Sequence, residues 1–149
     1  LETVRNATLD DIGGILSLIE PLENEGVLIK RPRENLETEI QKFTIVEHDG
    51  LIVGCVALNP FKKEKLGELA CLAVHPTFQH AGVGERLLKA IEANCIKQKL
   101  GHVFVLTIAS SHWFLENGFK KTSLTNLPKA KAKLYNYQRS SKIYIKAIK

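Results

Sequence analysis

One stretch, residues 66–84, constrains the fold more than any other part of the chain. It begins with an apolar run, Leu66–Val74, which contains a single carboxylate, Glu68. Pro76 should end this run, because proline has no N–H for a β-ladder and favours extended geometry in the residue before it. Gln79–Gly84 (QHAGVG) follows, and apolar residues then recur at helical spacing. The stretch therefore predicts a buried strand, a glycine-bearing turn and the start of an amphipathic helix.

The turn at Gln79–Gly84 also suggests a function. Glycines let backbone N–H groups approach an anion closely, and the N-terminus of a helix adds favourable partial charge. We interpret the turn as a phosphate-binding loop. The alternative is a tight strand-to-helix connection whose glycines merely relieve crowding, because the spacing alone is a weak signal.

The composition is that of an ordinary globular domain. The chain has 149 residues, of which 44% are hydrophobic and 25% charged, enough for one domain with its own core. No apolar run approaches the roughly 20 residues that span a bilayer, and the N-terminus lacks a signal-peptide pattern. The 3 cysteines lack CxxC spacing and indicate neither a disulfide framework nor a zinc site. We expect a single cytoplasmic domain over residues 1–149, without bound metal or a membrane partner.

Strand and helix patterns are interleaved along the chain. Thr8 and Asp11 have capping-box spacing before a helix that should end at Pro21. Asp49-Gly50 lies between two apolar strands and predicts a hairpin, whose second strand should end at Asn59-Pro60. Further strands are expected at 4–7, 103–107, 119–122 and 142–147, and further helices after Pro32, at 112–117 and after Pro128. This alternation predicts an α/β fold with a mixed sheet.

The C-terminal end is strongly basic. Between Lys129 and Lys149 the chain carries seven lysines and arginines and no Asp or Glu. Such a segment could contact nucleic acid or an anionic small molecule. It contains no recognisable nucleic-acid motif, so we interpret it as solvated surface and expect no nucleic-acid partner.

Gln79–Gly84 resembles the acetyl-CoA-binding motif of the GNAT superfamily of acyl-CoA N-acyltransferases. Trp113–Phe119 resembles the second landmark of that family, an aromatic helix that ends in Gly-Phe. The narrower resemblance is to the acetyltransferase domain of the bacterial N-acetylglutamate synthases, and it rests on residues 11–15, 30–31, 67–76 and 134–142. The resemblance implies a mixed, mostly antiparallel sheet flanked by helices, with acetyl-CoA as co-substrate and L-glutamate as acceptor.

Those synthases commonly carry an amino-acid-kinase-like domain ahead of this one. Residues 1–149 contain no such domain. The sequence therefore leaves open an excised catalytic domain or a short stand-alone form, and it leaves open the oligomeric state, a homo-oligomer included.

Glu68 is the first candidate catalytic residue. A carboxylate in an apolar strand is costly to bury unless it is paired or functional. Regular alternation would place it on one face with Ala70, Leu72 and Val74, in the core or a cleft. Such a position would suit it to take a proton, through water, from a substrate ammonium. The resemblance implies this general-base role, and a strand carboxylate pointing at water is the alternative.

Cys71 is a second candidate. A thiol nucleophile is chemically reasonable, yet a small buried cysteine is usually inert packing. The resemblance implies direct transfer instead, with the backbone amide of Cys71 holding the thioester oxygen as negative charge develops.

The general acid departs from the family pattern. In many members a tyrosine four residues before the landmark glycine protonates the departing CoA sulfur, and this chain has Phe114 there. Thr107 is our candidate acid, with Tyr135 or Tyr137 as the alternative.

The resemblance assigns CoA binding to the end of the strand and to the loop: Leu72, Ala73, Val74, Gln79, His80, Ala81, Gly82, Val83, Gly84 and Glu85. For glutamate the site must pair two carboxylates, which arginine does well through bidentate bonds. The residues that fit the synthase pattern are Lys30, Arg31, Arg139 and Ser141. Each of these alone could equally be surface charge.

These observations predict an acetyl-CoA-dependent amino-acid N-acetyltransferase that makes N-acetylglutamate for arginine biosynthesis. One alternative is a GNAT enzyme with another amine acceptor, such as a polyamine, a small molecule or a protein N-terminus. The other is a non-catalytic module that binds acetyl-CoA as a sensor.

Overall fold

A computed structural model describes residues 1–136 and 139–149, which divide into two compact units. The first unit comprises Leu1–Leu58 and Cys71–Ile91. The second comprises Asn59–Ala70 and Glu92–Lys149.

The described chain folds into strands and helices in an interleaved order. The strands are β1 (Glu2–Asn6), β2 (Phe43–His48), β3 (Leu51–Phe61), β4 (Leu66–Val74), β5 (His102–Thr107), β6 (Lys120–Thr122) and β7 (Lys142–Ala147). The α-helices are α1 (Ile12–Asn24), α2 (Arg33–Thr38), α3 (Val83–Lys97), α4 (Ser111–Glu116) and α5 (Lys129–Lys133). Short 3₁₀ turns lie at Leu9–Asp11, Ile40–Lys42, Pro76–Phe78 and Leu124–Asn126.

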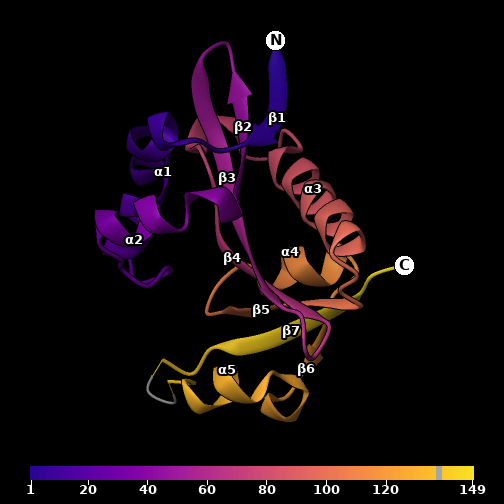
Figure 1. The fold of residues 1–149 in the computed structure, drawn as a ribbon. Coiled ribbons are helices and arrows are strands. Elements are labelled where there is room, and N and C mark those ends of the chain that lie inside the picture. The colour runs from indigo at the N-terminus through magenta and orange to yellow at the C-terminus, as the bar shows by residue number, and fades with distance from the viewer. Residues whose placement is uncertain (137–138) are drawn as a thin grey trace. The chain divides into compact units, whose positions relative to one another are not determined.

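The strands form one unclosed sheet in the order β1-β2-β3-β4-β5-β7-β6 (Figure 1). The pairs β1–β2, β2–β3, β5–β7 and β6–β7 are antiparallel, and β4–β5 is parallel. The expected α/β class with a mixed, mostly antiparallel sheet is confirmed.

In the first unit, the predicted hairpin joins β2 to β3. Its turn residues Asp49 and Gly50 have φ values of 48° and 85°, as a two-residue hairpin turn requires. The capping box at Thr8 is also present, because Asp11 Oδ2 accepts the Thr8 N–H at 2.7 Å. Local sequence signals therefore set both features.

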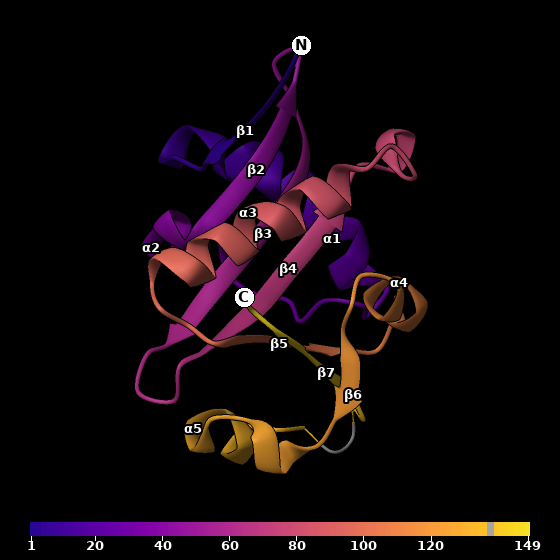
Figure 2. The ribbon, with the colours of Figure 1, turned by 90° about the vertical axis from the view of Figure 1, so that its right-hand side faces the viewer.

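One additional residue in β3 places Ile52 and Gly54 on opposite faces of the strand, although they lie two positions apart. Val46 pairs with Gly54 and Glu47 with Ile52, so Val53 is an extra residue in the ladder. Ile52 faces α1, where a methyl group added to Gly14 would lie 2.6 Å from its Cδ1. Gly54 faces α3. Helices α1 and α3 thus cover opposite faces of this unit's strands (Figures 1 and 2).

Two predicted boundaries at prolines were wrong. Helix α1 continues through Pro21 to Asn24, because Pro21 lies exposed in the last turns and its missing N–H costs only one helical bond. Strand β3 continues through Pro60 to Phe61, because a proline φ fits extended backbone and removes only a donor. Strand β1 also lies slightly earlier than residues 4–7.

In the second unit, alternation along β7 packs its two faces against different helices. Ile143 belongs to a core cluster with Phe104 and Leu127, against which Ala132 of α5 packs. The next residue, Tyr144, stacks on Phe114 of α4 at 6.3 Å between ring centroids. Helices α4 and α5 therefore cover opposite faces of the β5–β7 pair.

No helix in the described part of the chain is both long enough and apolar enough to cross a membrane.

Candidate functional site

The glycine loop has the predicted strand–turn–helix context. After β4, the Nδ1 of His75 accepts the Thr77 N–H at 3.1 Å and closes the first turn. His80 and Gly82 then adopt left-handed φ values of 65° and 81° before α3 begins at Val83. Such a conformation at Gly82 favours the residue without a side chain.

This loop can hold an anion. The first turn of a helix presents N–H groups without intrahelical acceptors, and the helix dipole favours negative charge there. Arg86 adds a cation that the sequence analysis missed. Its Nη2 donates to the Ala81 carbonyl at 3.1 Å and to Glu2 Oε2 at 3.0 Å. The only sequence signal was a basic residue in the first turn of a helix, which is common on surfaces.

Cys71 has an unusual backbone within β4. Its φ is 53°, although non-glycine residues seldom adopt left-handed geometry in a strand. The side chain is buried, and the Cys71 carbonyl accepts a hydrogen bond from the Cys55 thiol at 3.5 Å. Backbone outliers of this kind cluster at functional sites. The geometry therefore favours a role for the Cys71 main chain over a role for its thiol.

The other two cysteines serve packing, as expected. Cys55 and Cys95 are fully buried. Burial raises the pKa of the Cys55 thiol strongly, and it raises the pKa of Cys95 to about 11, with the Glu92 carboxylate adding to the effect. Both are therefore protonated and unreactive near neutral pH.

Glu68 is buried and has two partners that the sequence analysis did not predict. Only 7% of the residue is exposed. Lys131 Nζ lies 2.8 Å from Glu68 Oε2, and Asn59 Nδ2 donates to Oε1 at 3.4 Å. Glu68 is the register partner of Phe104 on the parallel strand β5, so both side chains point to the face that α5 covers. The carboxylate thus pairs with polar groups at the edge of an apolar layer.

The candidate general acids have their hydroxyl groups engaged. Thr107, at the end of β5, donates to the Ala109 carbonyl and accepts the Ala109 N–H at 3.0 Å. Tyr135 donates to the Ser141 carbonyl at 2.6 Å. Tyr137 lies outside the described residues. Phe114 is 3% exposed and packs against Phe119 and Tyr144, so this position serves the core.

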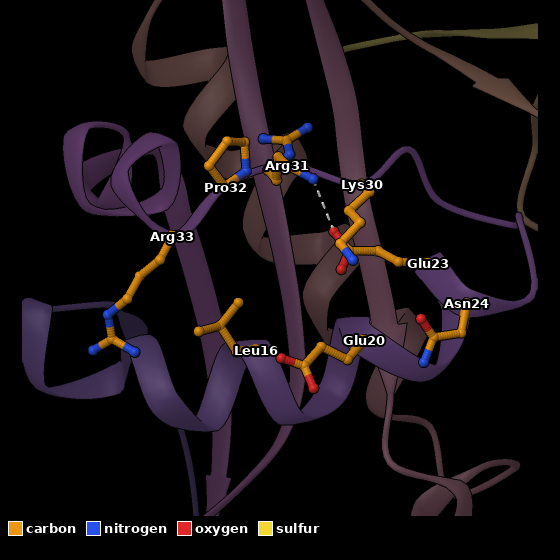
Figure 3. Close-up of a pocket in the computed structure, with 8 residues that line it drawn as sticks. All are labelled: Leu16, Glu20, Glu23, Asn24, Lys30, Arg31, Pro32 and Arg33. Atoms are coloured by element: carbon orange, nitrogen blue, oxygen red, sulfur yellow. Dashed lines mark hydrogen bonds between the residues drawn. The ribbon is translucent and has the colours of Figure 1, made fainter.

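Lys30 and Arg31 line a pocket of about 400 Å³ in the first unit. Figure 3 shows α1 on one side of this pocket and residues 30–33 on the other. Glu23 of α1 accepts the Arg31 N–H at 3.1 Å, and the Arg31 guanidinium lies 4.0 Å from Glu39. The pocket therefore mixes carboxylates with cations. Its lining is Leu16, Glu20, Glu23, Asn24, Lys30, Arg31, Pro32 and Arg33.

Arg139 and Ser141 belong to the second unit, in the segment between α5 and β7. The Arg139 N–H donates to the carbonyl of Asn136 at 3.2 Å, and Ser141 is buried. Glu68 and Thr107 lie in the same unit, whereas the glycine loop, Cys71 and Arg31 lie in the first. The two predicted substrate-binding arginines, Arg31 and Arg139, therefore belong to different units.

Within the part of the chain that the structure describes, no three His, Cys, Asp or Glu side chains are grouped to hold a metal ion.

Comparisons with known proteins place this geometry in context. Residues 39–121, more than half of the chain, match the model of the acetyltransferase (GNAT) domain. An amino-acid acetyltransferase of Photobacterium profundum is 55% identical over 147 residues, which cover 99% of this chain and 33% of that protein.

Solved structures of an N-acetylglutamate synthase are also similar to this chain. The N-acetylglutamate synthase of Neisseria gonorrhoeae, complexed with coenzyme A and N-acetyl-glutamate, has a TM-score of 0.96 and 40% identity over 100% of this chain and 35% of its own. The same enzyme with coenzyme A and L-arginine has a TM-score of 0.89 and 39% identity, over 99% of this chain and 33% of its own. The chain therefore spans about a third of the length of these relatives.

Proposed function

This chain belongs to the GNAT acetyltransferase family, and on that premise we propose that it transfers the acetyl group of acetyl-CoA to the α-amino group of L-glutamate. The product, N-acetylglutamate, would serve arginine biosynthesis, and residues 1–149 would form the acetyltransferase domain. The observation that carries the proposal is the buried carboxylate of Glu68, within the strand that leads to the glycine loop. Relatives named amino-acid acetyltransferases, similar over almost the whole of this chain, support it.

Acetyl-CoA would bind along the first unit. The amides around Gly82 and Gly84 suit its diphosphate, and Arg86 supplies a cation beside the same loop. The extended backbone of Leu72–Val74 offers N–H and C=O groups to the amides of the pantetheine arm.

Acetyl transfer would then proceed without an acyl-enzyme. Glu68 takes a proton, through water, from the glutamate ammonium, and the freed amine attacks the thioester carbon. The backbone amide of Cys71 holds the oxyanion. The C–N bond forms and the C–S bond then breaks. The CoA sulfur takes a proton from Thr107, and the Thr107 oxygen recovers a proton from the acetylated nitrogen, which has one proton to lose. Thr107 must first release its hydrogen bond to the Ala109 carbonyl.

The acceptor is proposed to be a dicarboxylate. Lys30 with Arg31, and Arg139 with Ser141, each supply groups that suit a carboxylate. The solved synthase with N-acetyl-glutamate supports this choice, because all of this chain is similar to 35% of that synthase.

CoA release with L-glutamate, compared with aspartate, glutamine and spermidine, tests the proposal. We expect glutamate to give the highest kcat/KM, and Arg31→Ala or Arg139→Ala to raise the glutamate KM by about tenfold or more. Glu68→Gln should lower kcat by roughly 10²–10⁴-fold. Glu64→Gln, at an exposed position before β4, is the matched control.

Three outcomes would contradict the proposal. Wild-type turnover by E68Q would show that Glu68 is not the general base. Equal turnover with spermidine would favour another amine acceptor. CoA binding without release in the presence of any amine would favour a sensor.

A further inference from the structure

Lys131 makes a close contact with the candidate general base. Its Nζ lies 2.8 Å from Glu68 Oε2, with side-chain exposures of 28% for the lysine and 9% for the glutamate. The two residues are far apart in the sequence, yet both belong to the second unit. An ion pair this buried is more costly to break than a pair at the surface.

Helix α5 is fixed to the sheet, so Lys131 is held in place. Leu127, just before the helix, is buried in the cluster with Phe104 and Ile143, and Ala132 and Tyr135 pack against the same cluster. The Tyr135 hydroxyl ties this segment to the Ser141 carbonyl. Lys129, at the start of the same helix, is exposed.

Two other neighbours of Glu68 carry no charge. From β3, Asn59 donates at 3.4 Å, and from β5 the register partner is the apolar Phe104. Among the residues that the structure describes, Lys131 is the one that makes an ion pair with this carboxylate. Without that ammonium, the buried carboxylate would have no opposite charge beside it, which is costly in an apolar layer.

We propose that Lys131 is a positioning residue for the acetyl-transfer reaction, which holds the Glu68 carboxylate in place for the incoming substrate ammonium. The inference rests on the proposed role of Glu68. The lysine does not need to touch the reacting atoms, because it acts through the carboxylate. Its loss should therefore lower kcat more than it changes the KM values.

Steady-state kinetics with glutamate and acetyl-CoA test this role. In Lys131→Met, kcat should fall by about tenfold, while the two KM values should change by less than about twofold. Lys131→Arg should keep the wild-type kcat. Lys129→Met, on the same helix but exposed, is the matched control and should behave as the wild type. Lys131→Gln, which keeps a hydrogen-bond donor but no charge, replaces K131M if that variant fails to fold.

A double variant separates a positioning role from a structural one. In an E68Q background, adding K131M should cause no further loss, because Lys131 then has no carboxylate to act on. An equal loss in both backgrounds would overturn the inference, as would a K131M variant with the same kcat as an active wild type. A wild-type chain that transfers acetyl to no amine would instead overturn the proposed function, and the inference with it.

Discussion

Asp11 of the first unit accepts several hydrogen bonds. It is 6% exposed, and both of its oxygens accept from the Arg5 guanidinium at 2.9 Å. The Thr8 N–H adds a bond of 2.7 Å. The Arg5 hydrogen bonds, with help from Thr8, hold the pKa of Asp11 below its usual range, although burial opposes them. The pair joins β1 to the start of α1.

This pair predicts a pH-dependent stability. A depressed pKa in the folded state contributes stability above the unfolded value of about 3.9, which is lost as the pH falls through the lower folded value. We expect Arg5→Met to lower the free energy of unfolding by about 2 kcal/mol at neutral pH. The difference should shrink below about pH 4.

Urea denaturation at neutral pH and in acid measures both effects. The control is Arg33→Met, because the Arg33 side chain is 57% exposed and its loss should change stability by less than about 0.5 kcal/mol. A difference that grows in acid would contradict the argument.

At the residue scale, local pairs were predictable and distant pairs were not. The Thr8–Asp11 box could be read from a spacing of three residues, and it is present. The partner of Glu68 could not be predicted from the sequence, because Lys129, Lys131 and Lys133 look equivalent there. Only the packing around α5 decides which lysine reaches the carboxylate.

At the scale of elements, the contact between β3 and α3 depends on Gly54. A methyl group there would lie 2.5 Å from Val83 Cγ1 and 3.0 Å from Leu87 Cδ1. Both neighbours are fully buried, so neither has room to move aside. Gly54→Ala should therefore destabilise the protein by about 1–3 kcal/mol and weaken CoA binding, because Val83 begins the helix at the glycine loop.

The matched control for this variant is Gly13→Ala in α1. A methyl group on Gly13 meets nothing within 4 Å, so alanine should stabilise the helix by up to about 1 kcal/mol. Thermal unfolding and calorimetric titration with CoA measure the two effects. A G54A protein as stable as G13A would show that α3 can move away from the strand.

Element boundaries could be predicted where a turn signal is strong. Asp49-Gly50 gave the hairpin correctly, because its backbone needs two left-handed residues. The extra residue Val53 has no such signal, since a valine is ordinary in a strand and the register depends on both partners. Pro21 and Pro60 were misleading because their local context tolerates a missing donor.

At the scale of the whole molecule, the fold class followed from interleaved patterns, but the strand order did not. Strand β7, the last in sequence, pairs with both β5 and β6. Such pairings depend on side chains that are far apart along the chain. The candidate site residues likewise fall in both units, a division that no single motif reveals.

Ligand binding should stabilise the whole chain. CoA at about 100 times its Kd should add about 2.7 kcal/mol to the free energy of unfolding and raise Tm by roughly 5–10 °C. Pantetheine, which lacks the diphosphate, should give little shift at the same concentration if the loop amides bind that group. If pantetheine raised Tm as much as CoA does, the loop would not contribute to CoA binding. Differential scanning fluorimetry suffices for the comparison.

The extra residue in β3 decides which side chains of that strand face each helix. It lets Ile52 face α1 and Gly54 face α3, although the two lie two positions apart. If the strand kept its length but paired without the bulge, Val53 would lie opposite Glu47 and Ile52 opposite His48, so Ile52 would turn away from Gly14. Loss of Val53 itself would leave Ile52 and Gly54 as neighbours on their present faces. A shorter strand could therefore keep this packing, whereas a shifted register could not.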